Sequence, residues 1–313
     1  MQVKVLGAAA GGAFPQWNCA CPNCAALRAG TFRGKSRTQT QVAITGDGSS
    51  WFLLGASPDL RIQIEATPEL HPRAGLRQSP IAGVLLANAD LDHTLGLLLL
   101  RELQPFRIQA TASVRRIVRE DNSFFHMLQR VPNQTVWSDF QLGNEFSLLD
   151  VRGKESGILC RAWSLSPHYP AYVTEERRAQ LDSREASLGF ILHSQDAASS
   201  SKSTPRLAFL PAVPEIDDDL LEQLESCDMI LFDGTFWSDD ELIRVQASGQ
   251  SALQMGHVPV EFTLNKLAGL RRPRKIFLHI NKTNPMLDEA SPQYRQVRGA
   301  GWEIAEDGWQ FNL

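Results

Sequence analysis

The sequence has few cysteines, no long apolar run and no excess of basic residues. Its 313 residues include five cysteines, 31 Lys and Arg residues and 35 Asp and Glu residues, for a formal net charge of -4. Binding to a nucleic-acid backbone needs a clearly basic face, so this balance argues against a nucleic-acid-binding protein. No apolar run reaches the roughly 18 residues that a membrane span requires. The apolar start at residues 1–7 is too short for a signal peptide, so we expect a soluble, cytoplasmic protein.

Three of the five cysteines lie close together. Cys19, Cys21 and Cys24 form a C-x-C-x-x-C cluster within a glycine-rich N-terminal loop at about residues 11–36. In a reducing compartment such a cluster is typical of metal binding or catalysis rather than of disulfides. Three thiolates can hold one tetrahedral zinc ion when a fourth ligand comes from elsewhere, and Cys160, Cys227 or a distant His or Asp are open candidates. We favour structural zinc over a redox thiol cluster.

Short apolar runs alternate with helical patterns along the chain. Residues 40–54 predict two strands joined by a Gly-Asp-Gly turn, and residues 81–87 predict a strand that is buried on both faces. The pattern also predicts strands at 229–232 and 275–280 and helices at 95–103, 217–226 and 259–270. Because no repeat or linker divides the chain, we expect one α/β domain over residues 1–313.

Candidate metal ligands follow the ends of several predicted strands, where ligands bind in α/β sheets. They are Asp92, His93, Asp233 and His279, and His257 adds another imidazole before a predicted helix. Taken singly, each could be a hydrogen-bonded core residue or a turn or helix cap. Their joint recurrence at strand ends favours a site for zinc, iron or manganese.

The order of these motifs resembles the metallo-β-lactamase fold, a four-layered αββα sandwich with metals in a cleft at its edge. The usual signature of that fold is H-x-H-x-D-H. Asn88 and Asp90 stand here in place of the first two histidines, whereas Asp92 and His93 match. Because those two imidazoles normally fill one metal site, their loss argues against a two-zinc hydrolase.

More specific segments resemble the coenzyme PQQ synthesis protein B family. They run in order from the first strand to past residue 290: residues 7–24 (GAAAGGAFPQWNCACPNC), 56–59 (ASPD), 91–94 (LDHT), 233–235 (DGT), 255–257 (MGH) and 279–285 (HINKTNP). Lys282 departs from the late motif, in which asparagine is expected.

The resemblance implies a role in making pyrroloquinoline quinone (PQQ), a redox cofactor built from a crosslinked Glu-Tyr pair. The family is regarded as an iron-dependent hydroxylase of the tyrosine ring, and was long described as a carrier of the quinone or its precursor towards the periplasm. When the metal ligands that the resemblance implies are transferred to this sequence, Asp92, His93 and His279 are the first-choice Fe(II) ligands, followed by Asp233. The implied ligands are PQQ or its precursor and the implied partners are other proteins of the pathway, while a homodimer stays open.

The residue types of the candidate ligands fit this chemistry independently of the resemblance. Two imidazoles and one carboxylate on one face of a metal leave positions open for oxygen and substrate, as in non-haem Fe(II) oxygenases. A zinc hydrolase would instead lower the pKa of a bound water. We therefore expect a mononuclear iron hydroxylase, with a carrier and a metallohydrolase as the alternatives.

Other residues are secondary candidates. His257 is a candidate acid–base catalyst or a donor to a metal ligand. Asp90 and His168 are candidate additional ligands. Asn281, Thr283 and Asn284 follow His279 closely and are candidate substrate-binding residues.

Overall fold

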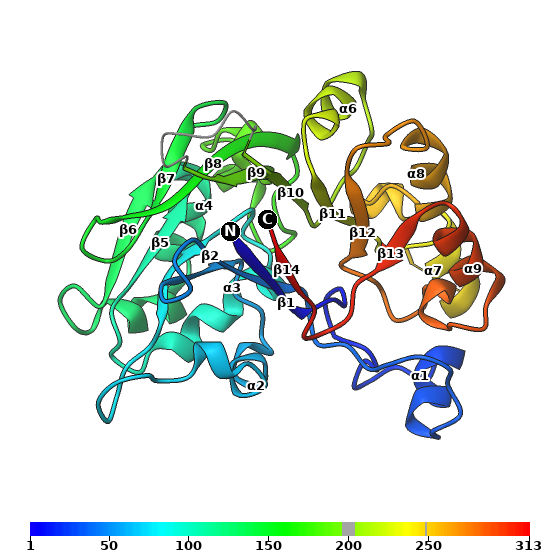
Figure 1. The fold of residues 1–313 in the computed structure, drawn as a ribbon, viewed down its shortest axis with the longest axis horizontal. Coiled ribbons are helices and arrows are strands. Elements are labelled where there is room, and N and C mark those ends of the chain that lie inside the picture. The colour runs from blue at the N-terminus through cyan, green and yellow to red at the C-terminus, as the bar shows by residue number, and fades with distance from the viewer. Residues whose placement is uncertain (196–203, 248) are drawn as a thin grey trace. The chain divides into compact units, whose positions relative to one another are not determined.

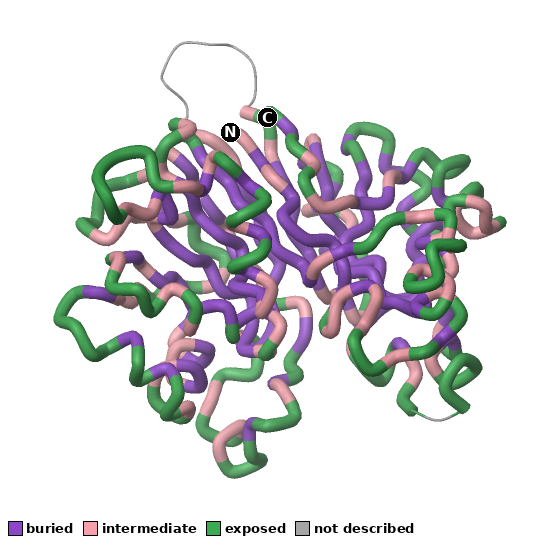
Figure 2. The backbone as a smooth tube through the Cα atoms, turned by 90° about the horizontal axis from the view of Figure 1, so that it is seen from below, coloured by how far each residue is buried: buried purple, intermediate pink, exposed green. Residues whose placement is uncertain are grey.

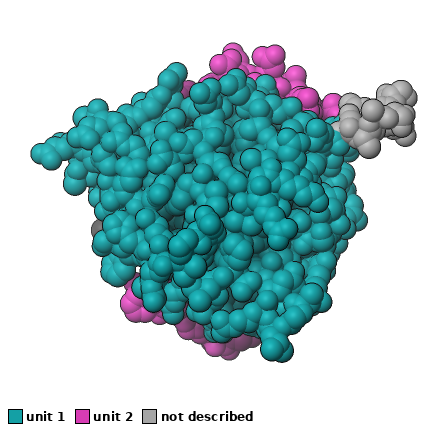
Figure 3. Space-filling view, turned by 90° about the vertical axis from the view of Figure 1, so that its left-hand side faces the viewer, with its two compact units in different colours: residues 1–6, 41–205, 308–313 teal, residues 7–40, 206–307 magenta. Residues whose placement is uncertain are grey.

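The computed structural model describes residues 1–195, 204–247 and 249–313 (Figure 1). The chain divides into two compact units, each built from separated stretches of sequence (Figure 3). Unit 1 comprises residues 1–6, 41–205 and 308–313, and unit 2 comprises residues 7–40 and 206–307. That the whole chain forms a single domain stays a prediction.

Unit 1 is built around a seven-stranded sheet in the order β14-β1-β2-β3-β4-β5-β6. The strands are β1 (Gln2–Gly7), β2 (Gln41–Thr45), β3 (Trp51–Leu54), β4 (Ile81–Leu85), β5 (Phe106–Ala110), β6 (Thr135–Asp139) and β14 (Gln310–Asn312). The two termini lie side by side because β1 pairs antiparallel with β14. From β3 to β6 the strands are parallel, which matches the continuous apolar run of β4.

Unit 1 also holds three adjacent antiparallel strands and most of the short helices. The strands are β7 (Glu145–Leu149), β8 (Glu155–Ser166) and β9 (Ser187–Ser194). The helices are α2 (Leu60–Glu65), η1 (Pro68–Leu70), α3 (Leu91–Thr94), η2 (Leu95–Leu100), α4 (Ala112–Arg115), η3 (Arg116–Asp121), η4 (Ser123–Gln129), α5 (Glu175–Arg178) and η5 (Ser183–Glu185).

Unit 2 contains four adjacent parallel strands with helices in the connections. The strands are β10 (Arg206–Leu210), β11 (Met229–Asp233), β12 (Arg274–Leu278) and β13 (Trp302–Ile304). The helices are α1 (Pro22–Arg28), α6 (Asp218–Glu225), α7 (Glu241–Gln246), η6 (Leu253–Met255), α8 (Val260–Lys266), η7 (Pro285–Leu287) and α9 (Pro292–Gly299). Parallel strands place their carboxyl ends at one edge, and β11 and β12 bring the segments after Asp233 and Leu278 together there.

The strands form the buried interior of each unit, while most connections are exposed (Figure 2). In unit 2 the ring of Trp302 stacks on Phe277 with centroids 4.1 Å apart and meets Phe232 edge-on at 6.0 Å. These three rings come from β11, β12 and β13, so they fix the spacing of the strands that deliver Asp233 and His279.

The strands predicted at 40–54, 81–87, 229–232 and 275–280 are present, and so are the helices predicted at 217–226 and 259–270. The helix expected at 95–103 is shorter and tighter, because η2 is a 3-10 helix that ends at Leu100. Leu103 has a φ of 65°, a left-handed conformation that an α-helix cannot contain. No helix among the described residues is long and apolar enough to cross a bilayer.

Asp307 ties the two stretches of unit 2 together. Its Oδ2 accepts hydrogen bonds from the Thr38 amide at 2.7 Å and the Thr38 hydroxyl at 2.8 Å, and its Oδ1 accepts from the Ala8 amide at 3.2 Å. Nearby, the buried Arg37 guanidinium donates to the Ala305 carbonyl at 2.8 Å. The N-terminal stretch that carries the cysteines is therefore held by a carboxylate close to the end of the chain.

Replacing Asp307 with Ala should lower the free energy of unfolding by about 2–4 kcal/mol, because two amides and a hydroxyl lose a charged acceptor. Glu306→Ala is the matched control, since Glu306 makes an exposed ion pair with Lys35 that is worth less than about 1 kcal/mol. Denaturant unfolding of both variants tests this, and equal losses would contradict the role assigned to Asp307.

Candidate active site

The carboxylate of Asp233, at the end of β11, is fully buried and surrounded by hydrogen-bond donors. Oδ1 accepts from the Thr235 amide at 3.0 Å and the Thr235 hydroxyl at 2.6 Å. Oδ2 accepts from the Val213 amide at 2.9 Å and from Nδ1 of His257 at 2.7 Å. A carboxylate offers about four acceptor positions, so these contacts use its full capacity.

Asp233 is held in its ionised form. Burial acts to raise its pKa, but the charge and hydrogen bond of His257, the charge of His279 and the Thr235 hydroxyl outweigh burial. The pKa of Asp233 therefore lies below its ordinary value. An ionised carboxylate accepts from every donor around it, which makes Asp233 an anchor for the neighbouring imidazoles.

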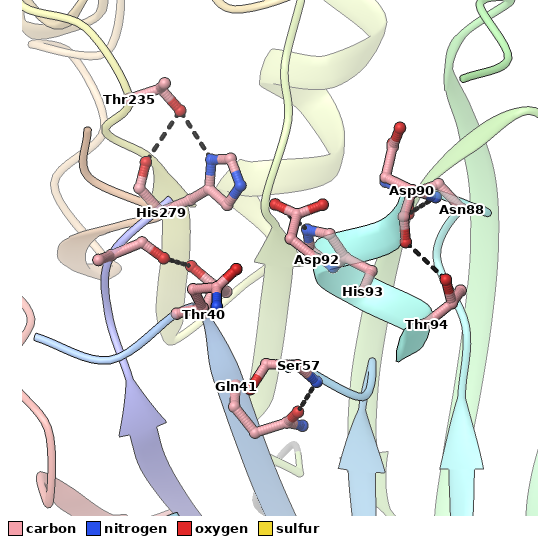
Figure 4. Close-up of polar contacts among 12 residues, drawn as sticks. Thr40, Gln41, Ser57, Asn88, Asp90, Asp92, His93, Thr94, Thr235 and His279 are labelled. Atoms are coloured by element: carbon pink, nitrogen blue, oxygen red, sulfur yellow. Dashed lines mark hydrogen bonds and ion pairs between the residues drawn. The ribbon is translucent and has the colours of Figure 1, made fainter. Parts of the chain in front are cut away.

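The Thr235 hydroxyl connects Asp233 to His279. Oγ1 of Thr235 lies 2.8 Å from Nδ1 of His279 and 2.9 Å from the His279 carbonyl (Figure 4). Because the single hydroxyl proton is given preferentially to the carboxylate, Oγ1 is left to accept a proton from Nδ1 of His279. One carboxylate thus fixes two imidazoles, His257 directly and His279 through Thr235.

Both imidazoles consequently direct Nδ1 to groups of the protein, His257 to Asp233 and His279 to Thr235. Their rings stack at 5.4 Å between centroids, and Asp233, His257 and His279 place potential ligand atoms within 4.8 Å of one another. Metal-binding histidines typically donate the other ring nitrogen to a carboxylate or another acceptor in this way. Imidazole nitrogens are ligands that zinc and iron accept, and Asp233 fixes two of them here.

The loop conformation depends on two backbone features. A Cβ at Gly234 would lie 2.9 Å from Cβ of Phe277 and 3.0 Å from the Leu278 carbonyl, so only glycine fits between β11 and β12. His279 has a φ of 55°, which is strained for a residue with a side chain. Strained conformations of this kind are found where the surrounding structure fixes a functional side chain.

Asn284 supports this loop through its side chain. Its Nδ2 donates to the Gly234 carbonyl at 3.0 Å, and its Oδ1 accepts from the Met286 amide at 3.0 Å. These bonds commit both ends of the amide to the protein backbone. The geometry therefore favours a positioning role for Asn284 over the substrate contact expected from the sequence.

In unit 1 the turn after β4 carries Asp92 and His93. His93 is buried and Asp92 is partly exposed, and Nε2 of His93 lies 3.8 Å from Oδ2 of Asp92. The Asp90 carbonyl accepts from the His93 amide at 3.0 Å and the Thr94 hydroxyl at 2.8 Å, and the Asp90 amide donates to Asn88 at 3.2 Å (Figure 4). Asp90 thus organises the turn through its backbone.

The segment at 55–57 packs against the His93 helix. The Ala56 amide donates to the His93 carbonyl at 2.7 Å, and the Gly96 amide donates to the Ala56 carbonyl at 2.9 Å. A Cβ at Gly96 would lie 2.2 Å from the Ser57 carbonyl, so this approach requires glycine. Gln41 holds the segment from the other side, because its Oε1 accepts from the Ser57 amide at 2.8 Å (Figure 4).

The predicted cysteine cluster is compact. Cys19, Cys21 and Cys24 bring their sulfur atoms within 4.8 Å of one another. Burial raises the pKa of Cys21, and it raises that of the fully buried Cys24 to about 12, so metal binding there would release protons. Asn23 donates to the Lys282 carbonyl at 3.0 Å and the Asn284 carbonyl at 3.2 Å, which ties the cluster to the loop after His279.

Asn281 and Thr283 belong to a buried polar chain that reaches Glu241. Asn281 Nδ2 donates to Thr283 Oγ1 at 2.5 Å, and that hydroxyl donates to Glu241 Oε1 at 2.5 Å. Glu241 and Thr283 line a hollow of about 390 Å³ together with Trp237 and Arg244. Burial, which outweighs these hydrogen bonds, raises the pKa of Glu241 to about 7.

The other candidates are placed differently. His168 is exposed and belongs to none of the potential metal-binding groups found in the described ranges. Sequence reasoning missed Thr235 and Glu241 as site residues. The Asp-Gly-Thr motif contained the signal for Thr235, since a hydroxyl two residues after a buried Asp can reach back to it. Nothing in the sequence marked Glu241 as buried.

Stability should depend on the ionisation of Glu241. Its pKa rises from 4.5 to about 7 on folding, so the folded state binds the proton more tightly. This contribution is complete below about pH 4.5 and is lost as the pH rises towards 7, for a total of about 3 kcal/mol. Glu241→Gln should remove this part of the pH dependence, as measured by denaturant unfolding at several pH values. The exposed Glu261→Gln is the control, and an unchanged pH profile in Glu241→Gln would contradict the assignment.

Comparisons with known proteins agree with this architecture. Residues 50–280 match the model of the beta-lactamase superfamily domain. Among solved structures, Zn(2+)-bound PqqB from Methylobacterium extorquens is 36% identical, with all of both chains covered and a TM-score of 0.88. A diphosphatase of the PhnP family is 16% identical with a TM-score of 0.65 and shares the fold. The predicted metallo-β-lactamase fold is therefore confirmed.

Curated relatives match over the full length. The chain is 39% identical to coenzyme PQQ synthesis protein B of Methylobacterium sp. (strain 4-46), with 100% of both chains covered. It is also 39% identical to the protein of that name from Gluconobacter oxydans (strain 621H), covering 100% of this chain and 99% of the relative. The chain belongs to the coenzyme PQQ synthesis protein B family, within the beta-lactamase superfamily.

Proposed function

We propose that this protein acts in the biosynthesis of PQQ as a metal-dependent enzyme. Full-length relatives at 36–39% identity are named for this pathway, and the superfamily domain covers residues 50–280. We place the protein in the cytoplasm with the other proteins of the pathway, and its ligand is PQQ or the precursor of PQQ.

The reaction we propose is O2-dependent hydroxylation of the tyrosine ring in the crosslinked Glu-Tyr precursor. The observation that carries this proposal is the fixed imidazole of His279, a proposed Fe(II) ligand, stacked on His257, a proposed acid–base group. Their Nδ1 atoms are held by Thr235 and Asp233. Fe(II), when bound, supplies the O2 chemistry that amino-acid side chains cannot perform. The protein's part is to hold the ligands and orient the ring.

The ligand set that we propose is Asp92, His93 and His279, and it follows from the sequence motifs. Asp233, also a predicted ligand, has its acceptor positions used by four hydrogen bonds, which supports a positioning role instead. Its hydrogen bond to Nδ1 fixes the imidazole of His257, for which we propose an acid–base role. His168 and Asp90 are not needed in this ligand set.

We further propose that the cysteine cluster holds a structural zinc ion. Three sulfur atoms within 4.8 Å fit the soft ligand set that zinc takes in such sites, with a fourth ligand to complete the tetrahedron. The M. extorquens PqqB structure contains Zn(2+), which supports zinc binding in this family. Through Asn23 this ion would stiffen the loop that bears Asn281 and Thr283, the proposed substrate-binding residues.

The protein reconstituted anaerobically with Fe(II) should consume O2 when the crosslinked Glu-Tyr precursor is added, and mass spectrometry should show a product heavier by oxygen. The Zn(II)-loaded protein should do neither, because zinc has no redox chemistry. His279→Ala should lose the activity, whereas the control His126→Ala, an exposed histidine of η4, should retain it.

Other outcomes would favour the alternatives. An unchanged precursor without O2 uptake, combined with saturable binding of PQQ, would contradict the hydroxylase and favour a carrier. Turnover by the zinc form without O2 would identify a metallohydrolase.

A further inference from the structure

Unit 2 contains a hollow beside Glu241, a residue to which the proposed chemistry gives no role. We call it the Glu241 hollow. Its volume is about 390 Å³, which lies within the range of about 300–1,000 Å³ for small-molecule sites. Its lining combines carboxylates, a guanidinium and apolar or aromatic side chains: Glu241, Glu261, Arg244, Trp237, Val245 and Pro285. The hollow therefore offers both charged and apolar contacts to a small ligand.

The carboxylate of Glu241 keeps acceptor positions that the protein does not use. Glu241 is only 4% exposed. Its Oε1 accepts from the Thr283 hydroxyl at 2.5 Å, and its Oε2 accepts from the Trp237 amide at 2.5 Å. A carboxylate offers about four acceptor positions, so about two remain for a donor that enters the hollow.

Glu241 also lacks a cation at contact distance. Within the described ranges it takes part in no ion pair, and Arg244 and Lys282 act on it only through their charge. A buried carboxylate is unfavourable without an opposite charge beside it, and burial accordingly raises the pKa of Glu241 to about 7. An ammonium group would supply both the missing charge and donors for the open acceptor positions.

Arg244 provides a second charged contact in the same hollow. Its guanidinium is largely exposed, lies 3.1 Å from Asp240 and donates to the Ser238 hydroxyl at 2.5 Å. An exposed pair between residues four apart on a helix contributes little stability, so Arg244 can exchange Asp240 for another carboxylate. Guanidinium groups bind carboxylates through two parallel hydrogen bonds.

We propose that the Glu241 hollow binds the α-amino-acid group of a small molecule, with the ammonium held by Glu241 and the carboxylate held by Arg244. The walls formed by Trp237, Val245 and Pro285 suit an aromatic or apolar side chain. A free amino acid and the crosslinked Glu-Tyr precursor both carry this group. The inference concerns binding alone, so it does not rest on the proposed hydroxylation.

Isothermal titration calorimetry of the full chain with L-phenylalanine tests the proposal. Phenethylamine lacks the carboxylate and 3-phenylpropionate lacks the ammonium, so each should bind at least about 10-fold more weakly than L-phenylalanine. Glu241→Gln should weaken the binding of L-phenylalanine by at least about 10-fold, because the amide carries no charge. Arg244→Gln should weaken the binding of L-phenylalanine but leave that of phenethylamine unchanged. Thermal unfolding verifies that both variants are folded.

Two controls separate the hollow from other sites. Glu222→Gln changes an exposed carboxylate of α6 that does not line the hollow, and it should leave the affinity unchanged. His279→Ala should also retain the binding of L-phenylalanine, since an amino acid that merely chelated a metal at the candidate active site would lose affinity in this variant.

The affinity should depend on pH. L-phenylalanine should bind about tenfold more tightly at pH 8 than at pH 6, because the ammonium binds the ionised carboxylate of Glu241. Arg244, Lys282, Glu261 and Asp240 are the other charged groups around the hollow. Carboxylates, guanidinium and ammonium groups ordinarily keep their charge between pH 6 and 8. The tenfold difference should therefore vanish in Glu241→Gln.

Competition with the crosslinked Glu-Tyr precursor identifies the source of the ligand. Displacement of L-phenylalanine by the precursor would identify the precursor as the ligand, and binding that the precursor does not displace would identify a free amino acid; both results support the site. A native protein that binds neither compound would overturn it and leave the hydroxylase proposal standing, because O2 uptake is measured separately. Equal binding of all three phenyl compounds, or binding lost in His279→Ala but kept in Glu241→Gln, would also overturn it.

Discussion

The ionised carboxylate of Asp233 is the constraint on which the candidate site depends. Four donors converge on it in a fully buried position, and two of the resulting links determine how His257 and His279 present their rings. Gly234 lets the strand ends approach closely enough for this, and the left-handed backbone of His279 is retained because Thr235 contacts both its ring and its carbonyl. The preference of each imidazole for one tautomer thus originates in a single acid.

Hydrogen bonds from asparagine side chains to backbone carbonyls connect the loop around Asp233 to neighbouring segments. Asn284 holds the Gly234 carbonyl, and Asn23 holds the carbonyls of Lys282 and Asn284. The cysteine cluster is therefore connected to the loop after His279, although it lies more than 250 residues away in the sequence. Asp307 anchors the same N-terminal stretch to the end of unit 2. A metal at the cysteines would stabilise the loop on which substrate contacts are proposed.

The sequence predicted the strands whose ends carry the site residues, because short continuous apolar runs such as residues 81–87 and 229–232 are typical of buried strands. It also singled out Asp233, His257, His279 and the three cysteines. The structure brings potential ligand atoms of Asp233, His257 and His279 within 4.8 Å of one another, and likewise those of the three cysteines. The sequence could not show that all acceptor positions of Asp233 are occupied. Two of its four donors come from Val213 and His257, which are distant from Asp233 in the sequence. The burial of Glu241 and the 3-10 geometry of η2 likewise arise from tertiary packing, which local patterns do not encode.

Metal affinity of Asp233→Asn compared with His279→Ala tests the central claim most directly. Both variants would be loaded anaerobically with Fe(II), with bound iron and zinc measured at increasing metal concentration. If Asp233 acts by orienting the imidazoles, Asp233→Asn should still bind its iron at saturation, but 10–100-fold more weakly. His279→Ala should lose that iron, and both variants should keep zinc at the cysteines. Complete loss of the iron in Asp233→Asn, or an affinity equal to that of the native protein, would contradict the account.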